Sequence, residues 1–138
     1  MARNGKQAGA DDASAEVDVS GQLTVPLDGQ DYLLRPSHEA IIAIERQLGP
    51  LFGLAQQATL GQLTIEQQAI CVAELMKAQY RADPNGSSAD YRDPKPKRLG
   101  ELIYEAGAPR ICARLAVLLT GAVNGGYTAE GEAKAGTP

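Results

Sequence analysis

The feature that most limits how this chain can fold is an Asp28-Gly29 pair between two short runs of strand-forming residues. Asp-Gly is a strong hairpin signal, because glycine accepts the positive φ that a two-residue hairpin turn requires. Residues 17–27 alternate between apolar and polar side chains, as in a strand with one buried face. We therefore predict a hairpin over residues 17–35, with a break or bulge at Gly21.

The hairpin is predicted to lead directly into a helix. Pro36 lacks the backbone donor that a strand ladder needs, so it ends the second strand. Ser37 can cap a helix over residues 38–48, and Gly49 can end that helix. A lone hairpin is marginally stable in water, so we expect it to pack on helices.

Apolar side chains at helical spacing predict four further helices, at about residues 50–57, 65–81, 98–106 and 109–124. The second of these, over residues 65–81, begins with a capping-box sequence in which Thr64 and Gln67 can satisfy each other's backbone amides. The fold class that follows is α+β and mostly helical. It has an N-terminal β-hairpin packed on four or five helices, in a single domain over residues 17–126.

Three segments carry no regular pattern. Residues 82–97 are polar and contain three prolines and an Asn-Gly pair, so we predict a long loop. Residues 1–16 and 127–138 are rich in small and polar side chains, and we predict that both are disordered tails.

Composition excludes several classes of protein. A net charge of −4 and a pI of about 5.0 argue against a non-specific nucleic-acid binder, which usually carries a basic face. No apolar run approaches the length of a membrane span, and residues 1–16 contain no apolar segment of a secretory signal. We therefore expect a cytoplasmic protein without a membrane partner. Cys71 and Cys112 lie in apolar, helix-like surroundings, where we expect core residues; a disulfide between them stays open.

Two polar residues, His38 and Glu45, occupy positions where a functional role is conceivable. His38 is the chain's one histidine, and we expect it to face solvent in the first turn of its helix. Glu45 lies at the edge of an apolar stripe and needs a partner. Arg35, Arg98 and Arg110 are the candidates for a structural ion pair with it.

The acidic residues of the second half match no known calcium loop, and lysine and arginine are interleaved among them. We read them as solvated; they are Asp83, Asp90, Asp93 and Glu101. The chain also lacks the glycine-rich phosphate-binding and serine-nucleophile motifs. We therefore expect no enzyme, no cofactor and no metal, and a function that depends on apolar helix faces binding another chain.

The order of these elements resembles a known family. The stretch DGQDYLLRPSHEAIIAIERQLG is similar to the N-terminal signature of small tail-assembly proteins of gene transfer agents and related siphophages. A Leu-x-x-Leu helix and a Leu-Thr-capped helix follow in that family, as at Leu51–Leu54 and Leu63–Thr64 here. The segment LGELIYEAG and the Leu/Ala-rich helix after it continue the likeness, which spans roughly residues 21–125. Residues 82–97 depart from it, because the loop is longer and richer in proline.

The resemblance implies a non-catalytic tail assembly chaperone that coats the apolar, helical tape-measure protein while tail tube subunits polymerise around it. The partners implied are the tape-measure protein and the tail tube protein, with self-association open and no nucleic acid. Leu51, Phe52, Leu54 and Leu119 are our candidates for an exposed apolar groove that binds the partner. Two alternatives stay open: a structural subunit of the tail tube or head–tail connector, and a small helical DNA-binding regulator.

Overall fold

The computed structural model describes residues 23–134, and the predictions for residues 1–22 and 135–138 lie outside this part. A two-stranded antiparallel hairpin precedes the helices, so the α+β, mostly helical fold class is confirmed. The elements are β1 (Leu23–Leu27), β2 (Gln30–Leu34), α2 (His38–Leu48), α3 (Leu51–Thr59), α4 (Ile65–Ala82), α5 (Ala89–Arg92), α6 (Pro96–Ala106) and α7 (Ala108–Val123).

The Asp28-Gly29 pair forms the predicted two-residue turn. Leu27 pairs with Gln30, and both turn residues have positive φ, +52° at Asp28 and +77° at Gly29. Two positive φ values in succession define a type I′ turn, whose twist matches that of the flanking strands. Side chains along β1 alternate between buried and half-buried, so the predicted period of two is confirmed for residues 23–27.

The junction between the hairpin and α2 follows the sequence closely. Ser37 caps α2 by accepting a hydrogen bond from the amide of Ala40 at 3.1 Å. The amide of Arg35 donates to the carbonyl of Leu75 on α4 at 3.1 Å, so the end of β2 is tied to that helix.

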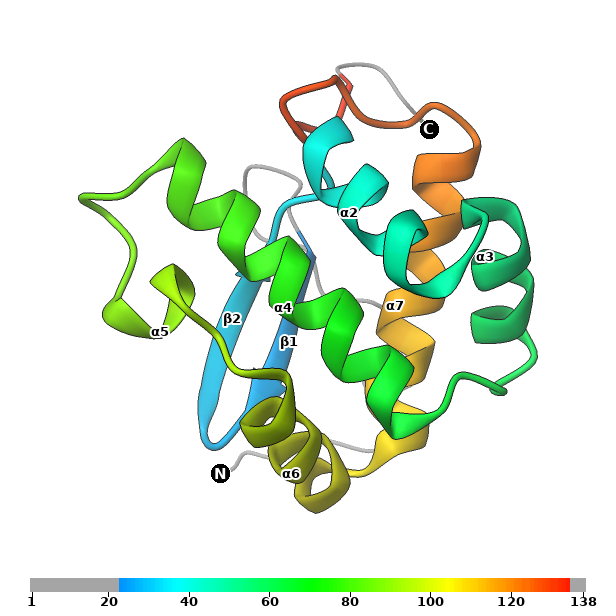
Figure 1. Cartoon of the computed structure of the whole chain (residues 1–138), viewed down its shortest axis with the longest axis horizontal. Helices are drawn as coiled ribbons and strands as arrows, with labels where there is room; N and C mark the ends of the chain where they lie inside the picture. The colour runs from blue at the N-terminus through cyan, green and yellow to red at the C-terminus, as the bar shows by residue number, and fades with distance from the viewer. Residues whose placement is uncertain (1–22, 135–138) are drawn as a thin grey trace, which may run out of the picture.

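Helix α4 lies at the centre of the described fold, crossing the hairpin with α2 and α6 beside it (Figure 1). Its predicted capping box is present: Thr64 Oγ1 accepts from the amide of Gln67 at 3.0 Å, and Gln67 Oε1 accepts from the amide of Thr64 at 2.9 Å. The face that α4 turns inward carries Ala69, Val72 and Met76, all fully or almost fully buried. The helical stripe read from the sequence is therefore confirmed at these three positions.

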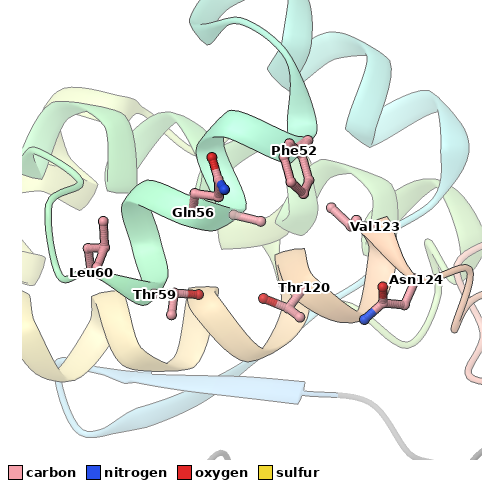
Figure 2. Close-up of a pocket in the computed structure, with 8 residues that line it drawn as sticks. Phe52, Gln56, Thr59, Leu60, Thr120, Val123 and Asn124 are labelled. Carbon is pink, nitrogen blue, oxygen red and sulfur yellow. The ribbon is translucent and has the colours of Figure 1, made fainter.

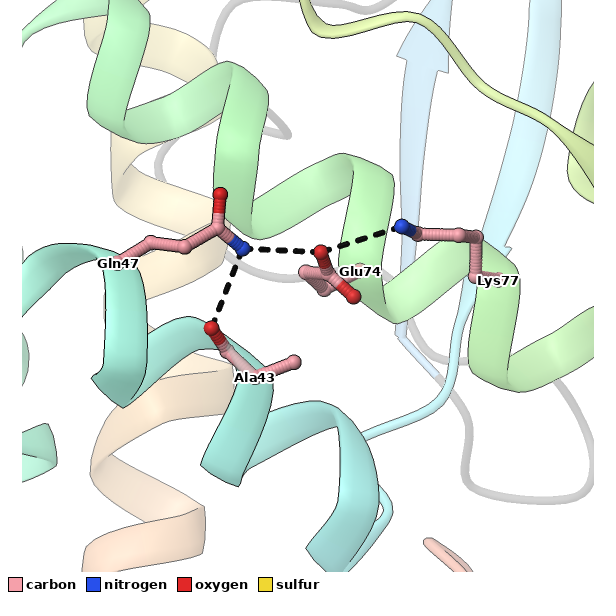
Figure 3. Close-up of polar contacts among 4 residues, drawn as sticks. All are labelled: Ala43, Gln47, Glu74 and Lys77. Carbon is pink, nitrogen blue, oxygen red and sulfur yellow. Dashed lines mark hydrogen bonds and ion pairs between the residues drawn. The ribbon is translucent and has the colours of Figure 1, made fainter.

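A polar contact joins α2 to α4 at the surface (Figure 3). Gln47 Nε2 donates to the carbonyl of Ala43 at 3.1 Å and to Glu74 Oε2 at 3.0 Å. The same carboxylate oxygen pairs with Lys77 Nζ at 3.2 Å. Glu74 thus has a partner on each of the two helices and links them outside the apolar core.

The prediction of an unstructured loop over residues 82–97 is wrong in part. A single helical turn, α5, forms within it, and α6 begins at Pro96. Tyr91 of α5 is buried; its hydroxyl accepts a hydrogen bond from the amide of Leu33 at 2.8 Å. Its ring meets that of Tyr32 edge to face, with centroids 5.6 Å apart. The local sequence does not reveal these contacts, because both partners lie on the distant hairpin.

The prediction of a disordered tail from residue 127 is wrong for its described part. Tyr127 and Ala133 form an antiparallel bridge, and the carbonyl of Ala129 accepts from the amide of His38 at 2.8 Å. Gly131 has φ of +93°, and a Cβ there would lie 2.5 Å from Cγ of Arg35. Residues 127–134 therefore pack closely on the junction between β2 and α2.

No single helix among residues 23–134 is long and apolar enough to cross a membrane. Taken together, α6 and α7 are long and apolar enough for a membrane span, but the two helices meet at a bend of 112°. Both cysteines are buried and free, as expected of core residues, so no disulfide joins them.

Candidate functional site

Two stretches without any charged side chain lie side by side in the fold. The chain is 22% charged overall, yet residues 47–65 and 115–129 contain no Asp, Glu, Lys or Arg. The first stretch includes all of α3, and the second includes the last half of α7. These two helices pack against each other (Figure 1), which brings the two uncharged stretches to one face.

An apolar groove of about 480 Å³ runs between α3 and α7. Phe52 lies near Val123 at one end, and Thr59 faces Thr120 further along, so the two helices run in opposite directions (Figure 2). The residues that line the groove are all uncharged: Phe52, Ala55, Gln56, Thr59, Leu60, Thr120, Val123 and Asn124. We refer to these eight residues as the α3–α7 groove.

Large apolar side chains stand exposed at this face. Phe52 is 62% exposed and Leu60 is 69% exposed, one at each end of α3. Val117, 47% exposed, shares a helix face with Thr120 and Asn124 because residues three and seven apart align on a helix. Exposed aromatic and aliphatic side chains without neighbouring charge are typical of the central part of protein–protein interfaces.

The four predicted partner-binding residues separate into two pairs. Phe52 is exposed in the α3–α7 groove. Leu51 is partly buried and lines a separate, smaller hollow that it forms with residues 127–129. Leu54 and Leu119 are 1% and 0% exposed, so the expectation that they are exposed is wrong. They lie on the inward faces of α3 and α7, where they belong to the core.

Leu60 and Val117 are missing from the sequence-based set. On α3, Phe52, Gln56 and Leu60 recur at every fourth residue, so the exposed face could have been found from this spacing together with the lack of charge. On α7, no such signal was available, because nearly every position after Arg114 is apolar or small. The packing of α7 alone decides that Leu118 is buried and Val117 is exposed.

Glu45 plays a structural part that differs from the predicted ion pair. Its Oε2 accepts a hydrogen bond from the amide of Leu51 at 2.8 Å, at the first residue of α3. Pro50 precedes that residue and offers no side-chain cap, so the carboxylate of Glu45 serves as one. A negative charge at a helix N-terminus is also favoured by the helix dipole. Glu45 therefore fixes the start of the helix that carries half of the groove.

The remaining polar candidates occupy separate positions. His38 is exposed, as predicted. Each of the four acids has a protein partner of its own: Asp83 accepts from Gly86, Asp90 from Tyr32, Asp93 from Lys95 and Glu101 from Arg98. Within residues 23–134, no group of three His, Cys, Asp or Glu side chains is arranged to hold a metal ion.

A second groove, of about 370 Å³, lies between the hairpin turn, α5 and the start of α6. Five of its eleven lining residues are charged: Asp28, Asp90, Asp93, Lys95 and Arg98. We refer to it as the α5–α6 groove. Burial, and the hydrogen bond to Asp90, raise the pKa of Tyr32 in its wall to about 12.

The thiol of Cys71 is buried, which disfavours its reactive form. Burial raises the pKa of Cys71 to about 12, and the neighbouring Cys112 adds to this shift. The thiolate is the reactive form of cysteine, and it is scarce at neutral pH when the pKa is this high. We therefore assign Cys71 to the packing of α4.

The described residues thus form a small α+β fold with an exposed, uncharged groove between α3 and α7. No family model, curated protein or solved structure matches the chain.

Proposed function

We propose that the protein is a phage or gene-transfer-agent tail assembly chaperone that binds the tape-measure protein without catalysing a reaction. The observation that supports this most is the α3–α7 groove, where Phe52 and Leu60 are exposed in a face without charges. A face of this kind is suited to an apolar partner, because burying it removes apolar surface from water and leaves no charged group buried without an opposite charge. The sequence resemblance described above supplies the class of partner, the tape-measure protein with the tail tube protein beside it.

The site of action in this proposal is the host cytoplasm during particle assembly. A chaperone of this type needs an apolar face that is open before the client arrives, and Phe52 is 62% exposed in the described chain. Leu54 and Leu119 have no direct part in client binding in this proposal, since the core already buries them.

Co-expression with a tape-measure protein tests the proposal. The protein to co-express is the product of any long reading frame beside this gene that encodes an extended helical protein. We expect the two proteins to co-purify, and the isolated chaperone to sediment as a small species. Failure to co-purify while both proteins remain folded would refute the proposal.

The two alternative functions predict different outcomes for the purified protein. A tail tube or connector subunit would form rings or tubes on its own, visible by electron microscopy. A DNA-binding regulator would shift duplex DNA in a salt-dependent manner. We favour neither, because the face that stands open is uncharged and the net charge is −4.

A further inference from the structure

We infer that the α3–α7 groove binds a single amphipathic helix whose docked stripe is itself uncharged, and that it rejects a charge of either sign on that stripe. This inference deepens the proposed function and rests on it for the biological client. It names where on the chain the client binds and which client side chains are accepted.

The uncharged lining sets the first condition. A lysine or glutamate on the docked stripe would lose water and find no opposite charge among the eight groove residues. The cost of burying an unpaired charge is much greater than that of burying an uncharged polar group. The four polar members, Gln56, Thr59, Thr120 and Asn124, can still hydrogen-bond small neutral polar groups of the client.

The shape of the groove sets the second condition. Its walls are two helices that lie side by side in opposite directions (Figure 2), and a third helix fits between such ridges. Phe52 lies in the first turn of α3 and Leu60 directly follows its last residue; these eight positions correspond to about 12 Å along the helix axis. An occupant that covers both therefore needs about two to three turns of helix.

Other modes of peptide binding fit this face less well. An added β-strand needs free backbone donors and acceptors, and the backbone groups along α3 and α7 are engaged in their own helices. A polyproline ligand needs a groove with several aromatic side chains, and Phe52 is the single aromatic residue in this lining. A client helix is the occupant that remains.

Synthetic peptides test the inference on the full-length protein. The parent peptide has about 18 residues, enough to form a helix in water, with leucines at positions i, i+4, i+7 and i+11 and polar residues elsewhere. Three further peptides replace one central leucine of the stripe by lysine, by glutamate or, as the uncharged control for the lost leucine, by glutamine. Fluorescence anisotropy of labelled peptides measures the affinities.

We expect the parent peptide to bind, and both charged peptides to bind at least about tenfold more weakly than the glutamine peptide. This pattern is specific to an uncharged groove. If the net charge of −4 governed binding, the lysine peptide would bind more tightly than the parent. That result, or no binding by the parent peptide, would overturn the inference.

Protein variants locate the binding site. Phe52→Asp and Leu60→Asp should each weaken parent-peptide binding about tenfold or more, because each places a charge in the groove. The matched control is Tyr104→Asp, since Tyr104 is 73% exposed on α6 and lines a different hollow from the α3–α7 groove. Circular dichroism confirms folding of each variant. An equal loss of peptide affinity in the control variant would overturn the inference. A wild-type dimer that Phe52→Asp abolishes would also overturn it, because the groove would then bind a second copy of the chain.

The outcome separates this inference from the proposed function. Co-purification of the tape-measure protein with both Phe52→Asp and Leu60→Asp would overturn the inference and leave the chaperone proposal standing. Peptide binding in the groove without any co-purification would do the opposite.

Discussion

The α3–α7 groove and the α5–α6 groove are similar in size, about 480 and 370 Å³, but opposite in chemistry. The first is lined by neutral side chains alone, whereas Asp93 and Lys95 of the second pair with each other at 2.7 Å. A partner entering the second groove would have to displace water from charges that are already paired within the protein. A partner entering the first would release water from apolar surface, which is favourable. Hollow volume alone therefore does not identify an interaction site.

The largest effect is expected within α3 itself, where neighbouring residues face opposite sides. Leu54→Ala should lower the free energy of unfolding by about 2–5 kcal/mol, because Leu54 is fully enclosed between helices. Phe52→Ala should change it by no more than about 0.5 kcal/mol, because Phe52 is mostly exposed. Urea denaturation measures both. Similar losses for the two variants would mean that Phe52 belongs to the core and would weaken the contrast between the grooves.

A smaller loss of stability is expected at Glu45, the α2 residue that caps the start of α3. Glu45→Ala removes the acceptor for the amide of Leu51 and should cost about 0.5–2 kcal/mol, the range of other lost helix caps. It should also weaken client binding, since the start of α3 positions Phe52. Glu105→Ala, at an exposed position on α6, serves as the control and should cost less than about 0.5 kcal/mol. Equal losses would show that Glu45 does not cap α3.

The wall of the α5–α6 groove should respond to pH. Tyr32→Phe removes the hydrogen bond to Asp90 and should cost about 0.5–1.5 kcal/mol at neutral pH. The pKa of Tyr32 is raised from 10.0 to about 12, so its protonated form is favoured by folding. The stability from this group is fully present below about pH 10 and is lost as the pH rises through about 12. Comparing tyrosinate absorbance titrations of wild type and variant checks the assignment; an unchanged curve near pH 12 would contradict it.

The smallest effect is expected at the exposed rim of the α5–α6 groove. The hydrogen bond and charge of Lys95 hold the pKa of Asp93 below its usual value of 3.8. Lys95→Ala should therefore raise the pKa of Asp93 toward that value in an NMR titration. The urea midpoint should stay unchanged, because exposed ion pairs are screened by water and salt. A clear loss of stability would show that the charged groove contributes more to the fold than its exposure suggests.

The sequence by itself determined the local structure where short-range chemistry is sufficient. The turn at Asp28-Gly29, the Ser37 cap and the reciprocal Thr64 and Gln67 capping box each involve residues within a few positions of one another. The alternation along β1 and the stripe on α4 followed from the same short-range patterns.

Tertiary structure decided what depends on residues far apart in the chain. The hydroxyl of Tyr91 accepts from the amide of Leu33 and holds in place a segment that its prolines predict to be a loop. The carbonyl of Ala129 accepts from the amide of His38 and holds the segment after α7 against α2. The α3–α7 groove also needed the fold, because an apolar helix shows which residues can be buried but not which of them a neighbour will cover. Packing buried Leu54 and Leu119 and left Phe52 and Leu60 exposed. A helix at the surface buries the face that meets the core, and its opposite face stays in contact with water.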